Sequence, residues 1–351
     1  MDVILMIVYA TIVLGVLVFV HEGGHYLAAK AFGVRVTEFM LGLPGPSIGF
    51  TWKGTRFGVT AIPLGGYARI CGMESGEQSP HLEQVLSFVY EKGTVNMEDV
   101  SGALKITDDE AYHALEELTE WGSIVGPTKK DSFNTYRTPV EGQHAMGDPR
   151  LVDNSATFFE NEFKQQYRSL PFWKRSIILL AGVVVNLLFA IVLFVLIYSV
   201  IGIDMVSSQT GEMIHYTTDP LHAIQVGFSY IGMVVQAVVG LFNPATAVET
   251  VSQSTSIMGI AVISKEYADA GLAYFLVFMA MISVSLGIMN LLPIPPLDGG
   301  RFIVEVFQKI TRKIIPVKVL NYLSAAGLIL FIGFFVVMLN QDVQRFIFGN
   351  W

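Results

Sequence analysis

Long apolar runs separated by polar segments dominate this chain. Four of them are long enough to cross a bilayer, because about 20 apolar residues span its hydrocarbon core; they cover residues 3–20, 177–201, 272–292 and 319–339. A fifth run, 223–242, is nearly as long but contains Gln225, Ser229 and Gln236. The pattern predicts an all-α polytopic membrane protein with about four transmembrane helices.

Basic residues indicate the orientation of these helices, because Lys and Arg favour the cytoplasmic side of a membrane. Basic residues cluster after the first apolar run, before the second run, and between the last two runs. Residues 202–271 contain only one basic residue, Lys265. Both termini are therefore expected to be extracytoplasmic, with residues 223–242 along the outer surface. The first run has no preceding Lys or Arg, which favours a retained transmembrane helix over a signal peptide.

Composition narrows the class of protein. Hydrophobic residues make up 52% of the chain and charged residues 15%, whereas soluble domains carry about 25% charged residues. The net charge of −8 disfavours a nucleic-acid partner, which usually requires a basic face. Cys71 is the only cysteine, so any metal site would have to use histidine and carboxylate ligands.

A polar insert, residues 75–167, separates a first membrane segment (1–74) from a second (168–351) and is expected on the cytoplasmic side. The sequence of the insert predicts helices over 81–91 and 96–105 and a third helix that starts at a Thr107–Glu110 capping box. It also predicts short strands over 123–126 and 132–138. This order resembles a winged helix, followed by an irregular stretch over 141–161. The third helix is acidic, which favours a protein partner or an autoinhibitory role over DNA binding.

A metal-binding motif continues the first apolar run. His21 and His25 flank Glu22 in the pattern HExxH, and on a helix the two imidazoles share a face and can hold one Zn²⁺. Glu22 would then act as the general base that takes a proton from the attacking water. Two structural histidines at a helix end are the alternative, but three ionisable groups within a membrane helix are costly unless they have a function.

A second polar segment ends the third apolar run. Residues 290–301 contain three prolines and Asp298, and such broken backbone is tolerated at membrane depth only where it is buried in protein or lines a cavity. The predicted orientation brings Asp298 to the same face as His21 and His25, which makes it the expected third zinc ligand. By itself, this segment would be an ordinary helix-ending turn.

These motifs resemble the site-2 protease family, and most closely its regulator of sigma-E protease (RseP) type. The resemblance rests on HExxH, on residues 290–300, on Ile62–Tyr67 as part of a membrane-associated β-hairpin, and more weakly on residues 180–186. It implies zinc ligation by His21, His25 and Asp298, general-base catalysis by Glu22, and substrate or oxyanion positioning by Asn290. It also implies substrates such as an anti-sigma factor or a signal-peptide remnant.

Two departures from that type concern the second run and the loop after it. Val183 stands where the family usually has proline. The stretch between Ile201 and Ala223 is far too short for the PDZ domains that this type carries, since domains need about 50 residues. Regulation through PDZ domains is therefore not expected.

A short strand is predicted over residues 57–64, with an edge left open at Val59, Thr60, Ala61 and Ile62. An unwound substrate could add itself there as a strand, although a purely structural hairpin on the membrane surface is the alternative.

Together the patterns predict a zinc metalloprotease, embedded in the bacterial cytoplasmic membrane among its lipids, that cleaves single-span membrane proteins. The alternatives are a zinc transporter and a non-proteolytic membrane regulator that uses the insert for binding.

Overall fold

Long helices form the core of the protein. The computed structural model describes residues 2–62, 65–73, 78–128, 131, 134–206 and 212–349. Five of its helices are long and apolar enough to cross a membrane: α1 (Asp2–Ala31), α6 (Phe172–Leu196, continued to Ile201 by the π-helical turn η2, Ile197–Ile201), α7 (Pro220–Gly240), α10 (Leu272–Asn290) and α12 (Val317–Phe346). The chain is thus a polytopic, mostly helical integral membrane protein.

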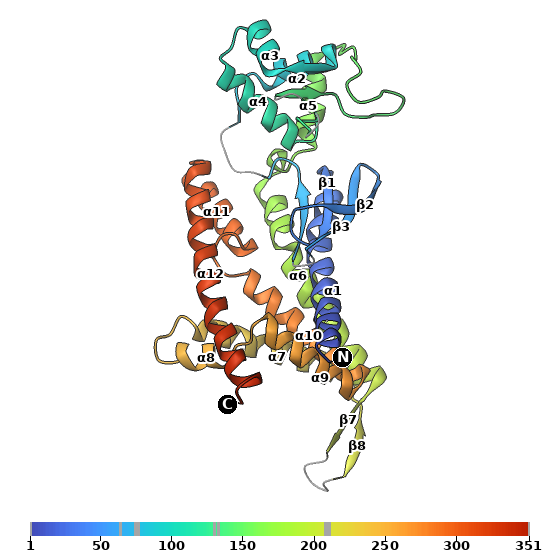
Figure 1. Cartoon of the computed structure of the whole chain (residues 1–351), viewed down its shortest axis with the longest axis vertical. Coiled ribbons are helices and arrows are strands. Elements are labelled where there is room, and N and C mark those ends of the chain that lie inside the picture. Colours follow the sequence, from blue (N-terminus) through green and yellow to red (C-terminus); the bar gives the residue numbers. More distant parts are fainter. Residues whose placement is uncertain are drawn as a thin grey trace.

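Helix α7 is the fifth candidate, and it corresponds to the ambiguous run over residues 223–242. It begins at Pro220, where the Asp219 side chain accepts hydrogen bonds from Leu221 and His222 and caps the helix. Figure 1 shows α7 crosswise to α12, at the end of the bundle where α8 (Ala247–Gln253) and α9 (Ile257–Ala270) lie. The other four candidates coincide with the four predicted spans.

Helices α1, α6 and α10 pack against one another around buried residues that include Val13, Leu17, Ala190 and Val284. The approach of α1 to α6 is especially close at Gly24, where a Cβ atom would lie 2.6 Å from the Ala181 carbonyl oxygen. Any larger residue would push the helices apart at the level of the HExxH motif.

A four-stranded sheet follows α1, and it is larger than the predicted hairpin. Its strands are β1 (Val36–Leu41), β2 (Ser47–Trp52), β3 (Thr55–Thr60) and β4 (Gly66–Ile70). They lie in the order β2-β3-β1-β4, with β1 and β3 parallel and the other pairs antiparallel. The edges of the sheet are therefore β2 and β4.

The prediction that Val59–Ile62 form an open strand edge is wrong. Val59 pairs with Leu41 on one side and with Ile48 on the other. Thr60 pairs with Ser47, the Ala61 N–H donates to the Pro46 carbonyl, and the Ile62 carbonyl accepts from Leu43 N–H. The prediction failed because strands β1 and β2, which occupy both sides of β3, were not recognised in the sequence. Pro63 and Leu64, which belonged to the predicted strand, lie outside the described residues.

The insert has a hydrophobic core of its own. Its elements are α2 (Leu82–Lys92), β5 (Thr94–Asn96), α3 (Met97–Leu104), α4 (Asp108–Glu120), β6 (Thr135–Arg137) and α5 (Ser155–Lys164). The core includes Val85, Leu115 and Tyr136, each fully buried. The capping box that Thr107 and Glu110 form at the start of α4 is confirmed.

Two details of the predicted insert are wrong. The strand expected over residues 123–126 is reduced to one bridge between Val125 and Arg137, and the strand that pairs along β6 is β5. Residues 141–161 were expected to be irregular, but α5 begins at Ser155 after an Asn154 cap, and its Phe158 packs on the insert core. Residues 129, 130, 132 and 133 of the predicted strand pair lie outside the described residues.

The remaining elements are η1 (Tyr167–Ser169), β7 (Ile203–Val206), β8 (Met213–Tyr216) and α11 (Asp298–Thr311). Figure 1 shows the insert at one end of the long axis and the β7–β8 hairpin at the other. The sheet lies between the insert and the helices, beside the half of α1 that carries the HExxH motif.

Candidate metal centre

Helix α1 supplies two imidazoles to the candidate site. It remains helical through the HExxH motif as far as Ala31, so His21 and His25 lie one turn apart on the same face. That face is turned into the protein, because His21 is 8% exposed and His25 7% exposed.

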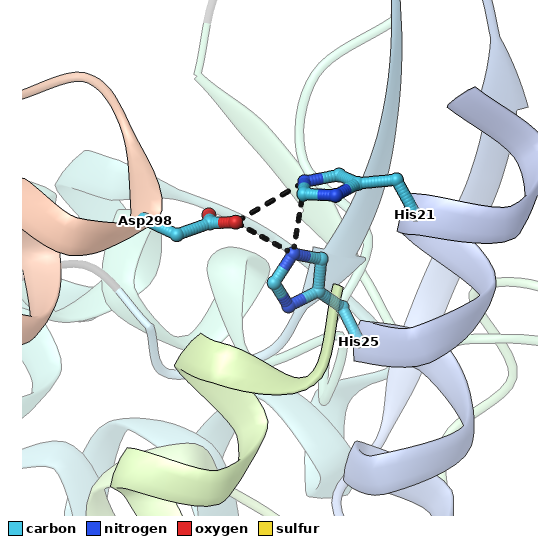
Figure 2. Close-up of side chains that lie close together, drawn as sticks. All are labelled: His21, His25 and Asp298. Atoms are coloured by element: carbon cyan, nitrogen blue, oxygen red, sulfur yellow. Dashed lines mark hydrogen bonds and ion pairs between the residues drawn. The ribbon is translucent and has the colours of Figure 1, made fainter. Parts of the chain in front are cut away.

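A carboxylate from a distant part of the chain completes the group. Asp298 is the first residue of α11, after the proline-containing turn that ends α10. Its Oδ2 atom lies 3.1 Å from His21 Nε2 and 3.2 Å from His25 Nε2, and the two Nε2 atoms are 3.4 Å apart (Figure 2). Among the described residues this is the one group of three His, Cys, Asp or Glu side chains close enough to share a metal ion.

These distances suit zinc. Two ligand atoms on a tetrahedral zinc ion with bonds of about 2.0–2.1 Å lie about 3.3 Å from each other, close to the three separations observed. Two imidazoles and one carboxylate are also a common donor set for catalytic zinc, which keeps a fourth position open. The residues present therefore fit a catalytic zinc ion.

Hydrogen bonds to the other ring nitrogens orient both imidazoles. His25 Nδ1 lies 2.7 Å from the Ile178 carbonyl oxygen, to which it can donate only when it carries the proton. That tautomer leaves the Nε2 lone pair free for a metal.

Asn186 of α6 does the same for His21. Its side-chain nitrogen is 3.3 Å from His21 Nδ1, while its Oδ1 atom is buried and has no hydrogen-bond partner among the described residues. A half-turn of the amide would exchange these two atoms, so that Oδ1 accepts from His21 Nδ1–H. Both needs are then met, because the buried oxygen gains a partner and His21 Nε2 becomes free to bind metal.

Helix α6 approaches the imidazoles through a glycine. A Cβ atom at Gly182 would lie 2.4 Å from His25 Nε2 and 2.8 Å from His21 Cε1. The backbone of α6 thus closes one side of the group, and a side chain at residue 182 would occupy the space of the ligand atoms.

Glu22 lies on the open side, beside strand β4. Its Oε2 atom accepts a hydrogen bond from the Ala68 backbone N–H over 3.0 Å. Glu22, His21, His25, Asn290 and Asp298 all line one cavity of about 280 Å³, together with residues of β4 and with Met73, Pro296 and Arg301. The cavity brings together the Glu22 carboxylate and three side chains that could hold a metal ion.

The structure separates the other predicted site residues from this group. Val59, Thr60, Ala61 and Ile62 do not line the cavity, whose strand residues come from β4 instead: Gly66, Tyr67, Ala68 and Ile70. Sequence reasoning missed β4, and it noted residue 186 only as part of a motif. An asparagine within an otherwise apolar span was the available signal for Asn186, since polar groups in a membrane helix need a partner.

Known proteins resemble this chain along nearly its whole length. The model of a family described as Peptidase family M50 matches residues 9–334. A relative in Rickettsia conorii, to which a zinc metalloprotease activity is attributed, is 27% identical over 358 residues that cover 95% of this chain and 97% of the relative. The zinc metalloprotease RasP of Geobacillus kaustophilus is 23% identical over 424 residues, which cover 95% of this chain and 97% of RasP.

Proposed function

Because the chain belongs to Peptidase family M50 and is an intramembrane zinc metalloprotease with Zn²⁺ as its cofactor, we propose that His21, His25 and Asp298 hold the zinc ion. The observation that carries this assignment is the convergence of three ligand atoms at tetrahedral spacing beside Glu22. Bound zinc would polarise the scissile carbonyl and lower the pKa of the attacking water toward about 7.

Glu22 is the proposed general base. It takes a proton from water as the water oxygen bonds to the carbonyl carbon, and it passes that proton to the amide nitrogen as the C–N bond breaks. The products are a carboxylate and an amine. Asn290 lies at the end of α10 on the same cavity, and its proposed role is to donate a hydrogen bond to the substrate carbonyl oxygen.

The substrate is a transmembrane segment of a single-span membrane protein, such as an anti-sigma factor or a signal-peptide remnant. A membrane helix hides its peptide bonds in its own hydrogen bonds, so it has to unwind locally before cleavage. Strand β4 is an edge of the sheet and lines the cavity, so an unwound segment beside it can form strand-like hydrogen bonds. This role replaces the one expected of Val59–Ile62.

Four spans and extracytoplasmic termini are the proposed topology, in a bacterial cytoplasmic membrane. The distribution of basic residues supports it, as does the crosswise position of α7 (Figure 1), which suits a helix on the outer surface. A topology reporter fused after Glu212 should report the extracytoplasmic side, and one fused after Thr138 the cytoplasmic side. A cytoplasmic signal after Glu212 would reverse the assignment.

The insert, taken as residues 75–167 between membrane parts 1–74 and 168–351, is proposed to be a winged-helix-like domain that binds a protein partner. Helices α2, α3 and α4 with the β5–β6 pair support the likeness. DNA is disfavoured because Asp108, Asp109 and Glu110 occupy the first turn of α4, where they would repel phosphates. The purified full-length protein should therefore retain no duplex DNA at physiological salt.

Comparison of membrane proteomes tests the function. Cells with the Glu22→Gln form should accumulate a membrane protein, or its membrane-bound remnant, that the wild type removes, while the variant keeps its zinc because no ligand is lost. Zinc transport and a non-proteolytic regulatory role are not favoured by the family, and they predict identical proteomes in the two strains. Wild-type cleavage by Glu22→Gln would overturn the role of Glu22.

A further inference from the structure

A basic cavity lies where α6 begins and α11 ends. It has a volume of about 340 Å³ and is lined by Arg168, Arg175, Gln308, Lys309, Arg312, Lys313 and Ile314. Five of these seven residues are basic and none is acidic, although the chain as a whole carries a net charge of −8. The cavity shares no lining residue with the cavity of the metal centre.

One carboxylate offsets part of this charge. Glu305 is 5% exposed, and its Oε2 atom lies 3.1 Å from Arg175 Nη1 while its Oε1 atom lies 3.8 Å from Arg168 Nη1. This contact fixes α11 against the start of α6. It leaves an excess of positive charge, because one carboxylate stands against five basic side chains.

The other three basic residues point to an external anion. Lys309, Arg312 and Lys313 are exposed, and no ion pair joins them to any residue that the structure describes. Like charges this close repel one another unless an anion lies between them. The cavity therefore has both the charge and the space for an anionic group.

Exposed apolar side chains lie on the face of α11 opposite Gln308 and Arg312, and one further exposed apolar residue lines the cavity itself. Ile303, Phe307 and Ile310 of α11 are 49%, 47% and 75% exposed, and their spacing places them on one face of the helix. Ile314, which lines the cavity, is 51% exposed, and Trp173 at the start of α6 is 55% exposed. A helix with an apolar face opposite a basic face is typical of the membrane interface, as is an exposed tryptophan.

We propose that this cavity binds the phosphate headgroup of an anionic phospholipid, whose acyl chains extend along Ile314. Basic pockets between membrane helices are suited to such headgroups. A free phosphate ion would satisfy the charges but would leave Ile314 in the cavity uncovered, so a lipid fits both the basic and the apolar lining. The bound headgroup would also join α6 to α11, the helix that begins with Asp298.

Lipid retention by the full-length protein tests the proposal. Wild type in nanodiscs of phosphatidylcholine with a minor share of phosphatidylglycerol should retain phosphatidylglycerol preferentially when it is released into native mass spectrometry. The triple variant Lys309→Gln, Arg312→Gln, Lys313→Gln should bind this lipid at least about tenfold more weakly, because each basic residue near a membrane surface contributes to the attraction. Arg312→Gln alone should show a smaller loss in the same direction.

A matched triple variant controls for net charge. Lys53→Gln, Lys92→Gln, Lys105→Gln removes three exposed basic residues that do not line the cavity, and it should retain phosphatidylglycerol like the wild type. Equal losses in the two triple variants, or no lipid preference in the wild type, would overturn the proposal. Inorganic phosphate distinguishes the two sources of the anion: it should not displace the lipid at equal concentration, and displacement would assign the cavity to free phosphate instead.

Discussion

The backbone N–H of Ala68 donates a hydrogen bond to the Oε2 atom of Glu22 over 3.0 Å. Ala68 lies in the middle of β4, and on its other side β4 pairs with β1, where Ala68 stands opposite Phe39. One hydrogen bond therefore joins the proposed general base to the edge strand that lines the same cavity. The strand positions Glu22 as well as bordering the space for the substrate.

Replacement of Ala68 by proline should slow cleavage without loss of zinc. Proline removes the N–H group that donates a hydrogen bond to Glu22. Proline is tolerated at this position because the N–H of Ala68 points away from the neighbouring strand of the sheet. A hydrogen bond to a charged group contributes about 1.5–3 kcal/mol, so kcat/KM should fall roughly 10- to 100-fold. Ala68→Ser keeps the N–H and should cleave like the wild type. Equal activity of the proline and serine variants would show that the hydrogen bond does not position Glu22.

Loss of the Asp298 carboxylate should remove metal as well as activity. Asp298→Ala removes one of the three proposed ligand atoms. Loss of a residue that only hydrogen-bonds to a ligand lowers metal affinity about 10–100-fold, so loss of a ligand should lower zinc affinity more than about 100-fold. Zinc per protein, measured by atomic emission, should drop well below that of Glu22→Gln, which loses no ligand. A chelator should inactivate the wild type, and added zinc should restore it. Full zinc content in Asp298→Ala would remove this residue from the ligand set.

The helices and the centre of the site were predictable because each depends on a strong local signal. The apolar runs indicated the long helices, the HExxH motif indicated two candidate ligands on one helical face, and the charge distribution suggested that Asp298 lies at the depth of His21. Prediction failed where pairing between distant segments decides the outcome. Whether β3 is an edge depends on β1 and β2. Strand β2 does alternate Ile48, Phe50 and Trp52 with small or polar residues, but that pattern does not indicate which strand it pairs with.

Helix α5 of the insert was not predicted because its sequence is mostly polar. Helix α5 has few apolar residues, but Phe158, Phe159 and Phe163 fall on the side that packs on the insert core. The partner of His21 was also out of reach of local patterns. Asn186 lies 165 positions from His21, and only packing of α6 against α1 makes it a neighbour.

The side-chain oxygen of Asn186 should raise zinc affinity, because it accepts a hydrogen bond from His21 Nδ1–H. Asn186→Leu removes the partner of His21 Nδ1, so zinc affinity should fall about 10–100-fold. Asn186→Asp keeps an oxygen in the same place and should bind zinc nearly as well as the wild type, measured by competition with a chromophoric chelator. If Asn186 instead donated to Nδ1, the aspartate variant would lose as much affinity as the leucine variant.

The contact between Glu162 and Arg35 should hold the insert to the membrane part of the protein. Glu162, on α5, is 8% exposed, and its two carboxylate oxygens accept hydrogen bonds from Arg35 Nη1 over 2.9 Å and from Nη2 over 3.1 Å. Arg35 immediately precedes β1, and Ser123 donates a further hydrogen bond to Glu162 over 2.5 Å. Glu162→Gln would leave the guanidinium without its counter-charge in a largely buried place.

Glu162→Gln should lower the free energy of unfolding by about 2–4 kcal/mol, because it leaves the buried Arg35 charge without a counter-charge. Denaturant unfolding of the detergent-solubilised protein measures this, and limited proteolysis near η1 should become faster as the insert detaches. Glu160→Gln is the matched control on the same helix, since Glu160 pairs with Lys164 in an exposed contact, and exposed ion pairs contribute little to stability. Equal effects of the two substitutions would mean that the insert is held by its apolar contacts and not by this ion pair.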